Sequence, residues 1–203
     1  MAGAAKFGKA ALGFRTHSGW ASAVLAAGSG AAIEILERRH VALCDSSKAG
    51  SKQPFHAAEP MPFAQAESHI ELCRKTTEAM ARDAIGAARA VCERQKIPLR
   101  SVCVITASGR ALPDLAAILA SHALIHAAEG EFYRDAILSA AKVLDLKATR
   151  LKAADALSHV AMRIDMSEGA MTKTLSEIGK TVGRPWTSDE KLATLAAWSM
   201  LAR

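Results

Sequence analysis

Residues 9–44 read KAALGFRTHSGWASAVLAAGSGAAIEILERRHVALC, and this stretch determines the fold. Two groups of turn residues, Ser18-Gly19 and Gly28-Ser29-Gly30, divide it into three apolar runs of strand length. Four aliphatic residues of the third run fall on odd-numbered positions, which indicates a strand with one buried face and one wet face. The stretch therefore predicts an antiparallel meander of three strands, over residues 10–17, 20–27 and 32–44.

The rest of the chain alternates helices with short strands. Residues 63–96 carry apolar side chains at three- and four-residue spacing and end before Pro98, which predicts a long helix. The run Ser101–Ala107 (SVCVITA) suits a strand buried on both faces, and the helix before it favours parallel pairing. A turn at 108–110, a helical region over about 113–146 and a strand over 148–153 are expected to follow.

The C-terminal part is predicted to be helical, with breaks near Gly169, near Gly179 and at 183–185. Its last helix starts at a capping box, in which Thr187 and Glu190 precede an apolar run. Residues 45–62, DSSKAGSKQPFHAAEPMP, are expected to form a long loop. Loops of this length are often lids or binding loops, so this segment is a candidate lid, with a mobile connector as the alternative.

Length and composition fit a single domain over residues 1–203. The four cysteines form no CxxC pair, which is typical of a reducing compartment, and no apolar run reaches 18 residues. We therefore expect a cytoplasmic protein without a membrane span. The net charge of +6 is spread along the chain, so it permits a nucleic-acid partner without requiring one. The Ala-rich helices favour a homo-oligomer.

The element order resembles the ribonuclease H-like superfamily, in its Holliday-junction-resolvase branch. Residues 133–153 (YRDAILSAAKVLDLKATRLKA) are similar to that branch's second helix and last strand, and 187–201 (TSDEKLATLAAWSML) to its closing helix. The segments GFRTHSGWA, HALIHAAEGEFYRDA and GRPWTSDEKLATLAAW are also similar to a bacterial protein family to which we assign no activity. The resemblance implies an α/β fold with a mixed five-stranded sheet flanked by helices, and an association with nucleic acid.

The resemblance also implies an activity that these residues do not support. Nucleases of this fold hold two Mg²⁺ ions with carboxylates on the first strand, at or after the fourth, and on the last helix. Here the first strand carries Arg15 and His17 instead of an acid, and 102–107 carries none. Asp189 alone matches, on the last helix. A standard two-metal nuclease is therefore not expected, and whether the chain is an enzyme stays open.

The predicted helix after Pro113 carries the strongest local pattern. His122, His126 and Glu129 have i, i+4, i+7 spacing, so they share one helix face, and that face is otherwise apolar. Buried titratable groups need partners, so this face predicts a structural hydrogen-bond network, a polar pocket with acid/base residues, or a divalent-metal site. Two imidazoles and a carboxylate suit Zn²⁺, Fe²⁺ or Mn²⁺.

Weaker candidates complete the prediction. Arg15 and His17 end the first strand, where this fold places its active site, and His56 in the 45–62 segment is able to close over such a site. Glu131 and Asp135, on an adjoining helix face, are candidate replacements for the missing carboxylates. We expect one polar pocket built from residues 15, 17, 122, 126, 129 and 189. Three hypotheses follow: a nucleic-acid-associated protein with a non-standard site, a non-enzymatic assembly module, or a metal-dependent enzyme acting on a small molecule.

Overall fold

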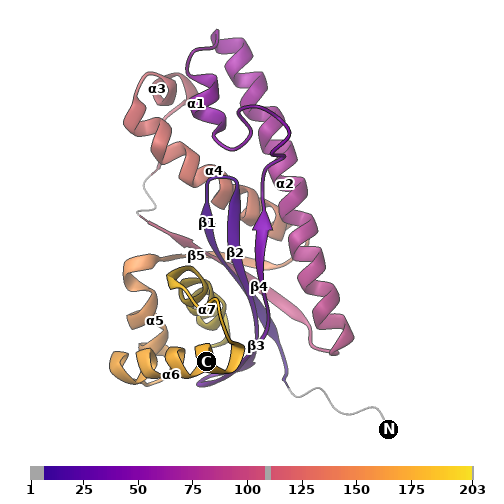
Figure 1. The fold of residues 1–203 in the computed structure, drawn as a ribbon, viewed down its shortest axis with the longest axis vertical. Helices are drawn as coiled ribbons and strands as arrows, with labels where there is room; N and C mark the ends of the chain where they lie inside the picture. Colours follow the sequence, from indigo (N-terminus) through magenta and orange to yellow (C-terminus); the bar gives the residue numbers. More distant parts are fainter. Residues whose placement is uncertain (1–6, 108–110, 203) are drawn as a thin grey trace.

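The computed structural model describes residues 7–107 and 111–202, and it holds a five-stranded sheet with helices on both faces (Figure 1). The strands lie in the order β3-β2-β1-β4-β5. Their bounds are Ala10–His17 (β1), Trp20–Ser29 (β2), Ala32–Ala42 (β3), Leu99–Thr106 (β4) and Lys147–Lys152 (β5). The first three strands pair antiparallel, and β4 pairs parallel with β1 and β5. The predicted meander followed by parallel strands is therefore confirmed.

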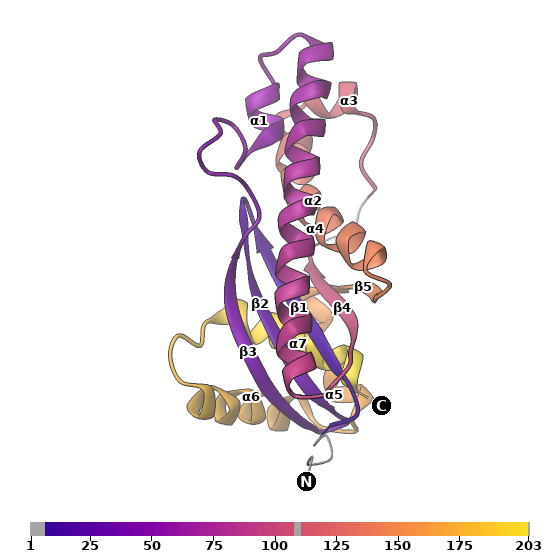
Figure 2. The same ribbon diagram turned by 90° about the vertical axis from the view of Figure 1, so that its right-hand side faces the viewer.

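Helices form a layer on each side of the sheet (Figure 2). The helices are α1 (Pro54–Ala58), α2 (Phe63–Arg94), α3 (Leu115–Leu119), α4 (His122–Val143), α5 (Ala156–Arg163), α6 (Glu168–Val182) and α7 (Ser188–Leu201). Helices α2 and α4 cover one face and α5, α6 and α7 the other, whereas α1 and α3 lie beyond the ends of the strands. Side chains of β1 alternate between the two layers: Leu12 and Phe14 join the core under α2 and α4, whereas Ala11 packs against α7. Within the described residues, no helix is long and apolar enough to cross a membrane.

The closest approach of helix and sheet lies at Gly13, in the middle of β1. A Cβ atom at this position would lie 2.0 Å from the carbonyl oxygen of Ala193 and 2.5 Å from the amide nitrogen of Ala197. Only a glycine facing the small residues of α7 allows this contact. The close contact fixes the start of α7, and hence Asp189, near the carboxyl end of β1.

The odd-numbered side chains of β3 lie on different faces of the sheet at the two ends of the strand. Leu25 pairs with Glu37 while its neighbour Ala26 pairs with Ile35, so Leu36 is an extra residue that forms a β-bulge. Before the bulge Ile35 packs against the α7 layer, and after it Val41 packs under α2. The prediction that the odd-numbered aliphatic residues of this strand share one face is therefore wrong.

The helix boundaries differ from the prediction at two places. The helical region after Pro113 is split, because Ser121 has an extended backbone and begins a new helix, α4. The breaks predicted near Gly169 and at 183–185 are confirmed, because α6 begins at Glu168 and ends at Val182. The break predicted near Gly179 is wrong: α6 runs through this residue, whose missing side chain leaves room for the ring of Trp186. The predicted turn at residues 108–110 lies outside the described residues.

The 45–62 segment is more ordered than a connector. It contains α1, and the hydroxyl of Tyr133 on α4 donates to the carbonyl oxygens of Ser51 and Lys52, at 3.0 and 2.8 Å. Together with α3 and the first turns of α2 and α4, it extends beyond the ends of the strands (Figures 1 and 2). Hydrogen bonds therefore hold the segment against α4. This contact was not predicted, because residues 45–62 have no periodic pattern.

Candidate functional site

Asp189 lies against Arg15 and His17, where β1 ends and α7 begins. Nε2 of His17 lies 2.9 Å from Oδ2 of Asp189, and Nε of Arg15 lies 3.8 Å from Oδ1. All three side chains are partly exposed, and Arg15 also donates to the carbonyl oxygen of Thr16, at 2.7 Å. The structure thus brings these three predicted residues together, with both carboxylate oxygens facing a nitrogen.

A stack of three aromatic rings continues from His17 across the ends of the meander strands. The rings of His17 and Trp20 are 4.2 Å apart and nearly parallel, and those of Trp20 and His40 are 4.3 Å apart at 18°. His40, on the edge strand β3, is exposed. This stack was not predicted from the sequence, although the Ser18-Gly19 turn implies the hairpin register that pairs His17 with Trp20.

These residues do not fit the two Mg²⁺ ions that the fold implies. Two hard cations need several oxygen ligands, but Arg15 places a guanidinium beside Asp189. Glu190, the next acid on α7, accepts from the backbone of Thr187 and completes the predicted capping box. Strand β4 ends in Thr106, whose buried hydroxyl has no hydrogen-bond partner in the described part of the chain. The site supplies one carboxylate with a cation beside it, so no metal-dependent step follows from it.

Glu131 is engaged in an ion-pair network on α4. Its Oε1 accepts from Arg134 at 2.8 Å, and its Oε2 pairs with Arg150 of β5, which also pairs with Asp135. Burial lowers the pKa of Arg134, and the nearby Glu131 charge opposes that shift. Gly130 leaves space for this guanidinium, because a Cβ atom there would lie 3.0 Å from it. The expectation that Glu131 or Asp135 replaces a missing metal ligand is therefore not supported by their partners.

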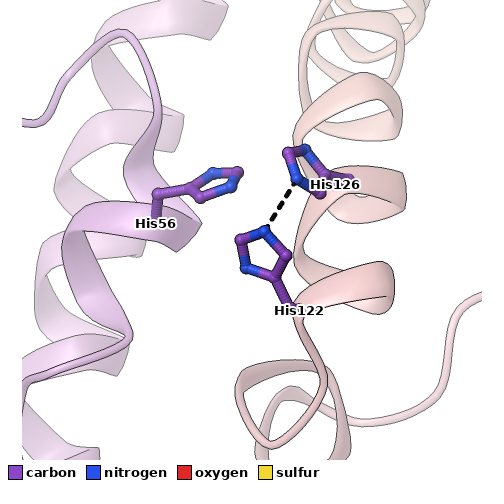
Figure 3. Close-up of side chains that lie close together, drawn as sticks. All are labelled: His56, His122 and His126. Carbon is purple, nitrogen blue, oxygen red and sulfur yellow. Dashed lines mark hydrogen bonds between the residues drawn. The ribbon is translucent and has the colours of Figure 1, made fainter.

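His122 and His126 lie on an exposed face, not on the buried one. Both side chains are exposed and come from the first turns of α4, a part of the helix that extends beyond the sheet (Figure 1). Their Nε2 atoms are 3.1 Å apart, and the ring of His56 on α1 lies against both (Figure 3). The prediction that both histidines face the core is wrong. The buried face of α4 contains Ile125 and Phe132, and the two histidines lie outside it.

Glu129 is the buried member of the predicted triad, with 3% of its surface exposed. Its Oε1 accepts from the backbone N–H of Phe55 at 2.8 Å and of His56 at 3.1 Å, and lies 3.2 Å from Nδ1 of His56. Burial raises the pKa of this carboxyl, and the hydrogen bonds from His56 and Phe55 act against that shift. Glu129 therefore orients His56 and the start of α1.

The predicted single pocket is thus divided into two groups. Arg15, His17 and Asp189 meet at the end of β1, whereas His122 and His126 meet His56 at the start of α4. Helix periodicity correctly paired the two α4 histidines with each other. The position of α1 could not be predicted from this periodicity. It brings His56 to the two histidines, and it makes Glu129 a hydrogen-bond partner of His56.

The sheet order, the helical layers and the site at the end of β1 define an α/β protein of ribonuclease H-like fold. The chain is similar to the structure of Thermus thermophilus RuvC in complex with a Holliday junction substrate, with 12% identity and a TM-score of 0.50, over 94% of this chain and 91% of that one. A second Thermus thermophilus RuvC structure is similar with 13% identity and a TM-score of 0.48, over 94% and 92% of the two chains. No protein-family model and no curated protein matches the sequence. The likeness agrees with the fold that the resemblance implied.

Proposed function

We propose that this protein binds nucleic acid at the carboxyl end of β1 and does not cleave it by a two-metal mechanism. The observation that carries the proposal is the contact of Arg15 with Asp189, at the place where nucleases of this fold hold their metal ions. A guanidinium attracts a phosphate group as a metal ion does, but it does not activate water. The similar Thermus thermophilus RuvC structure, which contains a Holliday junction substrate, supports the choice of ligand class.

The surface next to Arg15 offers both kinds of contact that such a ligand needs. Arg15 keeps 29% of its side chain exposed. One terminal nitrogen donates to the carbonyl oxygen of Thr16, and we expect the guanidinium to contact a phosphate through the other. The stack of His17, Trp20 and His40 ends in an exposed ring on which an unpaired base is able to stack. Such stacking contributes about 1–3 kcal/mol per base and tolerates any sequence. The combination favours single-stranded or branched nucleic acid over a plain duplex.

The test is fluorescence anisotropy with labelled single-stranded DNA, duplex DNA and a four-way junction, at two salt concentrations and with EDTA present. We expect binding that weakens with salt, because phosphate contacts release counterions. Arg15→Gln is expected to weaken binding to all three and reduce the salt slope by about one, since it removes one phosphate contact. His40→Ala is expected to weaken binding to the single strand and the junction more than to the duplex.

The matched control is Lys173→Ala, which removes an exposed charge on α6 and is expected to leave binding unchanged. Absence of salt-dependent binding by the unmodified protein, or an equal loss in Lys173→Ala, would contradict the proposal. A second assay incubates the labelled junction with Mg²⁺. Intact DNA is the expected result, and cleavage lost in Asp189→Asn would show that the site holds metal after all.

A further inference from the structure

Three imidazoles meet between α1 and α4, away from the Arg15–Asp189 contact. His56, His122 and His126 each offer a ring nitrogen, and these three atoms lie within 4.8 Å of one another. The rings point into a common space (Figure 3). None of the three is fully buried, so the packing of the core does not explain why they converge.

We propose that His56, His122 and His126 bind one Zn²⁺ ion, with a water molecule as the fourth ligand and Glu129 as the hydrogen-bond partner of His56. The inference does not depend on nucleic-acid binding. The sequence predicted Glu129 as the third ligand beside His122 and His126, and the proposed site has His56 in its place. Imidazole nitrogens suit Zn²⁺, and a site with three protein ligands leaves one position open to water.

The spacing of the two α4 histidines fits this ion. Nitrogens bound to zinc at about 2.0–2.1 Å in a tetrahedron lie about 3.3–3.4 Å apart. The Nε2 atoms of His122 and His126 are 3.1 Å apart, so the pair needs only a small rotation of the rings. Histidines four residues apart on a helix are a known zinc-binding arrangement, because both rings lie on one face.

Glu129 gives His56 the ring orientation that a ligand requires. A histidine that binds a metal through one nitrogen usually donates the N–H of the other to a carboxylate. Nδ1 of His56 lies 3.2 Å from Oε1 of Glu129, so Nε2 is the nitrogen of His56 that would bind the ion. The same oxygen accepts two backbone N–H groups of α1, and Oε2 of Glu129 has no partner among the described residues. A nearby dication compensates the buried charge of this carboxylate.

The position of the site indicates what the metal does for the fold. Two ligands come from α4 and one from α1, in the 45–62 segment, so the ion joins two parts of the chain that are distant in sequence. His122 and His126 are both exposed, so we expect water to reach the open position. Zinc binding is therefore expected to hold the 45–62 segment against α4 and to raise the stability of the protein.

The experiment uses the full chain without a histidine tag, freed of metal by a chelator and then dialysed. Titration with Zn²⁺ against a chromophoric chelator is expected to show about one tightly bound ion, and X-ray absorption about three nitrogen neighbours at about 2.0–2.1 Å. His122→Ala and His126→Ala are each expected to abolish that binding. Both side chains are exposed, so neither substitution is expected to disturb folding. His159→Ala, on α5, is the matched control and is expected to bind zinc normally.

Two further measurements separate a metal site from a chance cluster. Glu129→Gln keeps an acceptor for His56 but removes the negative charge, so we expect zinc affinity to fall about 10–100-fold while the three nitrogen neighbours remain. Zinc is also expected to slow proteolysis within residues 45–62 of the unmodified protein, but not of His126→Ala. Absence of stoichiometric binding, or binding that survives both histidine substitutions, would overturn the proposal.

Discussion

Arg15 and Asp189 meet at the junction of β1 and α7, with Nε of one 3.8 Å from Oδ1 of the other. His17 lies against the remaining carboxylate oxygen at 2.9 Å, so each oxygen of Asp189 has a nitrogen beside it. Asp189 therefore matches the last-helix acid that the resemblance implies, but a guanidinium and an imidazole lie beside it. A fold of this kind carries function only through the groups placed on it.

Arg15→Asp is expected to create a Mg²⁺ site. The substitution replaces the guanidinium with a second carboxylate next to Asp189. Carboxylate oxygens are ligands that Mg²⁺ prefers, whereas the imidazoles of the proposed zinc site do not suit this ion. We expect Mg²⁺ to raise the Tm of Arg15→Asp relative to EDTA and to leave the unmodified protein unchanged, in a thermal unfolding measurement. The double variant Arg15→Asp, Asp189→Asn is the control. A Mg²⁺ effect that persists in it would contradict the assignment.

Gly13→Ala is expected to destabilise the protein by about 3 kcal/mol, at the upper end of what an overpacked core costs. The new Cβ atom would overlap the backbone of α7 at Ala193, which is rigid helix and not a flexible side chain. Gly86→Ala on the exposed side of α2 is the control, because nothing lies within 4 Å of its new Cβ. Better helix propensity is expected to stabilise that variant by up to about 1 kcal/mol. Urea unfolding measures both, and equal effects would contradict the close contact.

Local sequence signals predicted the elements, and their failures have physical causes. The Ser18-Gly19 turn and the Thr187–Glu190 capping box each depend on neighbouring residues, so β1 and the start of α7 fall where they were expected. The bulge at Leu36 and the five-residue helix α1 depend on contacts across the fold, which no local pattern encodes.

In the candidate site, too, local relations were predicted and contacts between distant segments were not. Helix spacing placed His122 beside His126 correctly, because that relation is local. Their exposure depends on how far α4 extends past the sheet, which is set by where α3 ends and α4 begins. His56 joins them from a segment without periodicity, through a hydrogen bond to Glu129 that spans much of the chain.

Glu131→Ala is expected to cost about 3 kcal/mol, because it leaves the buried guanidinium of Arg134 without its counter-charge. Asp135→Ala removes the other carboxylate of the same network, but that side chain is 52% exposed. Its loss is expected to cost about 1 kcal/mol or less. Chemical unfolding compares the two variants. A larger loss in Asp135→Ala would show that Arg150, and not Arg134, is the cation that needs a partner.

Glu129 is expected to make the metal-free protein less stable as pH rises. Burial raises the pKa of this carboxyl above its ordinary value of 4.5. Between that value and the higher pKa of the folded state, the folded protein holds a proton that the unfolded chain has lost. The free energy of unfolding therefore falls as pH increases through this window, and the contribution of Glu129 is largest below it. Glu129→Gln removes the titration, so the stability of the unmodified protein minus that of the variant is expected to decrease from pH 4.5 upward.

The groups around Glu129 allow the stability difference between the unmodified protein and Glu129→Gln to be assigned to this carboxyl. Burial raises the pKa of both Cys73 and Tyr133, so these groups stay neutral through the window. Repeating the comparison in a His56→Asn background removes the contribution of the imidazole next to Glu129. Urea unfolding at several pH values, with EDTA present throughout, provides the measurement. A difference that grows with pH would mean that the hydrogen bonds from α1 outweigh burial, and Glu129 would then be a stabilising carboxylate even without a metal ion beside His56.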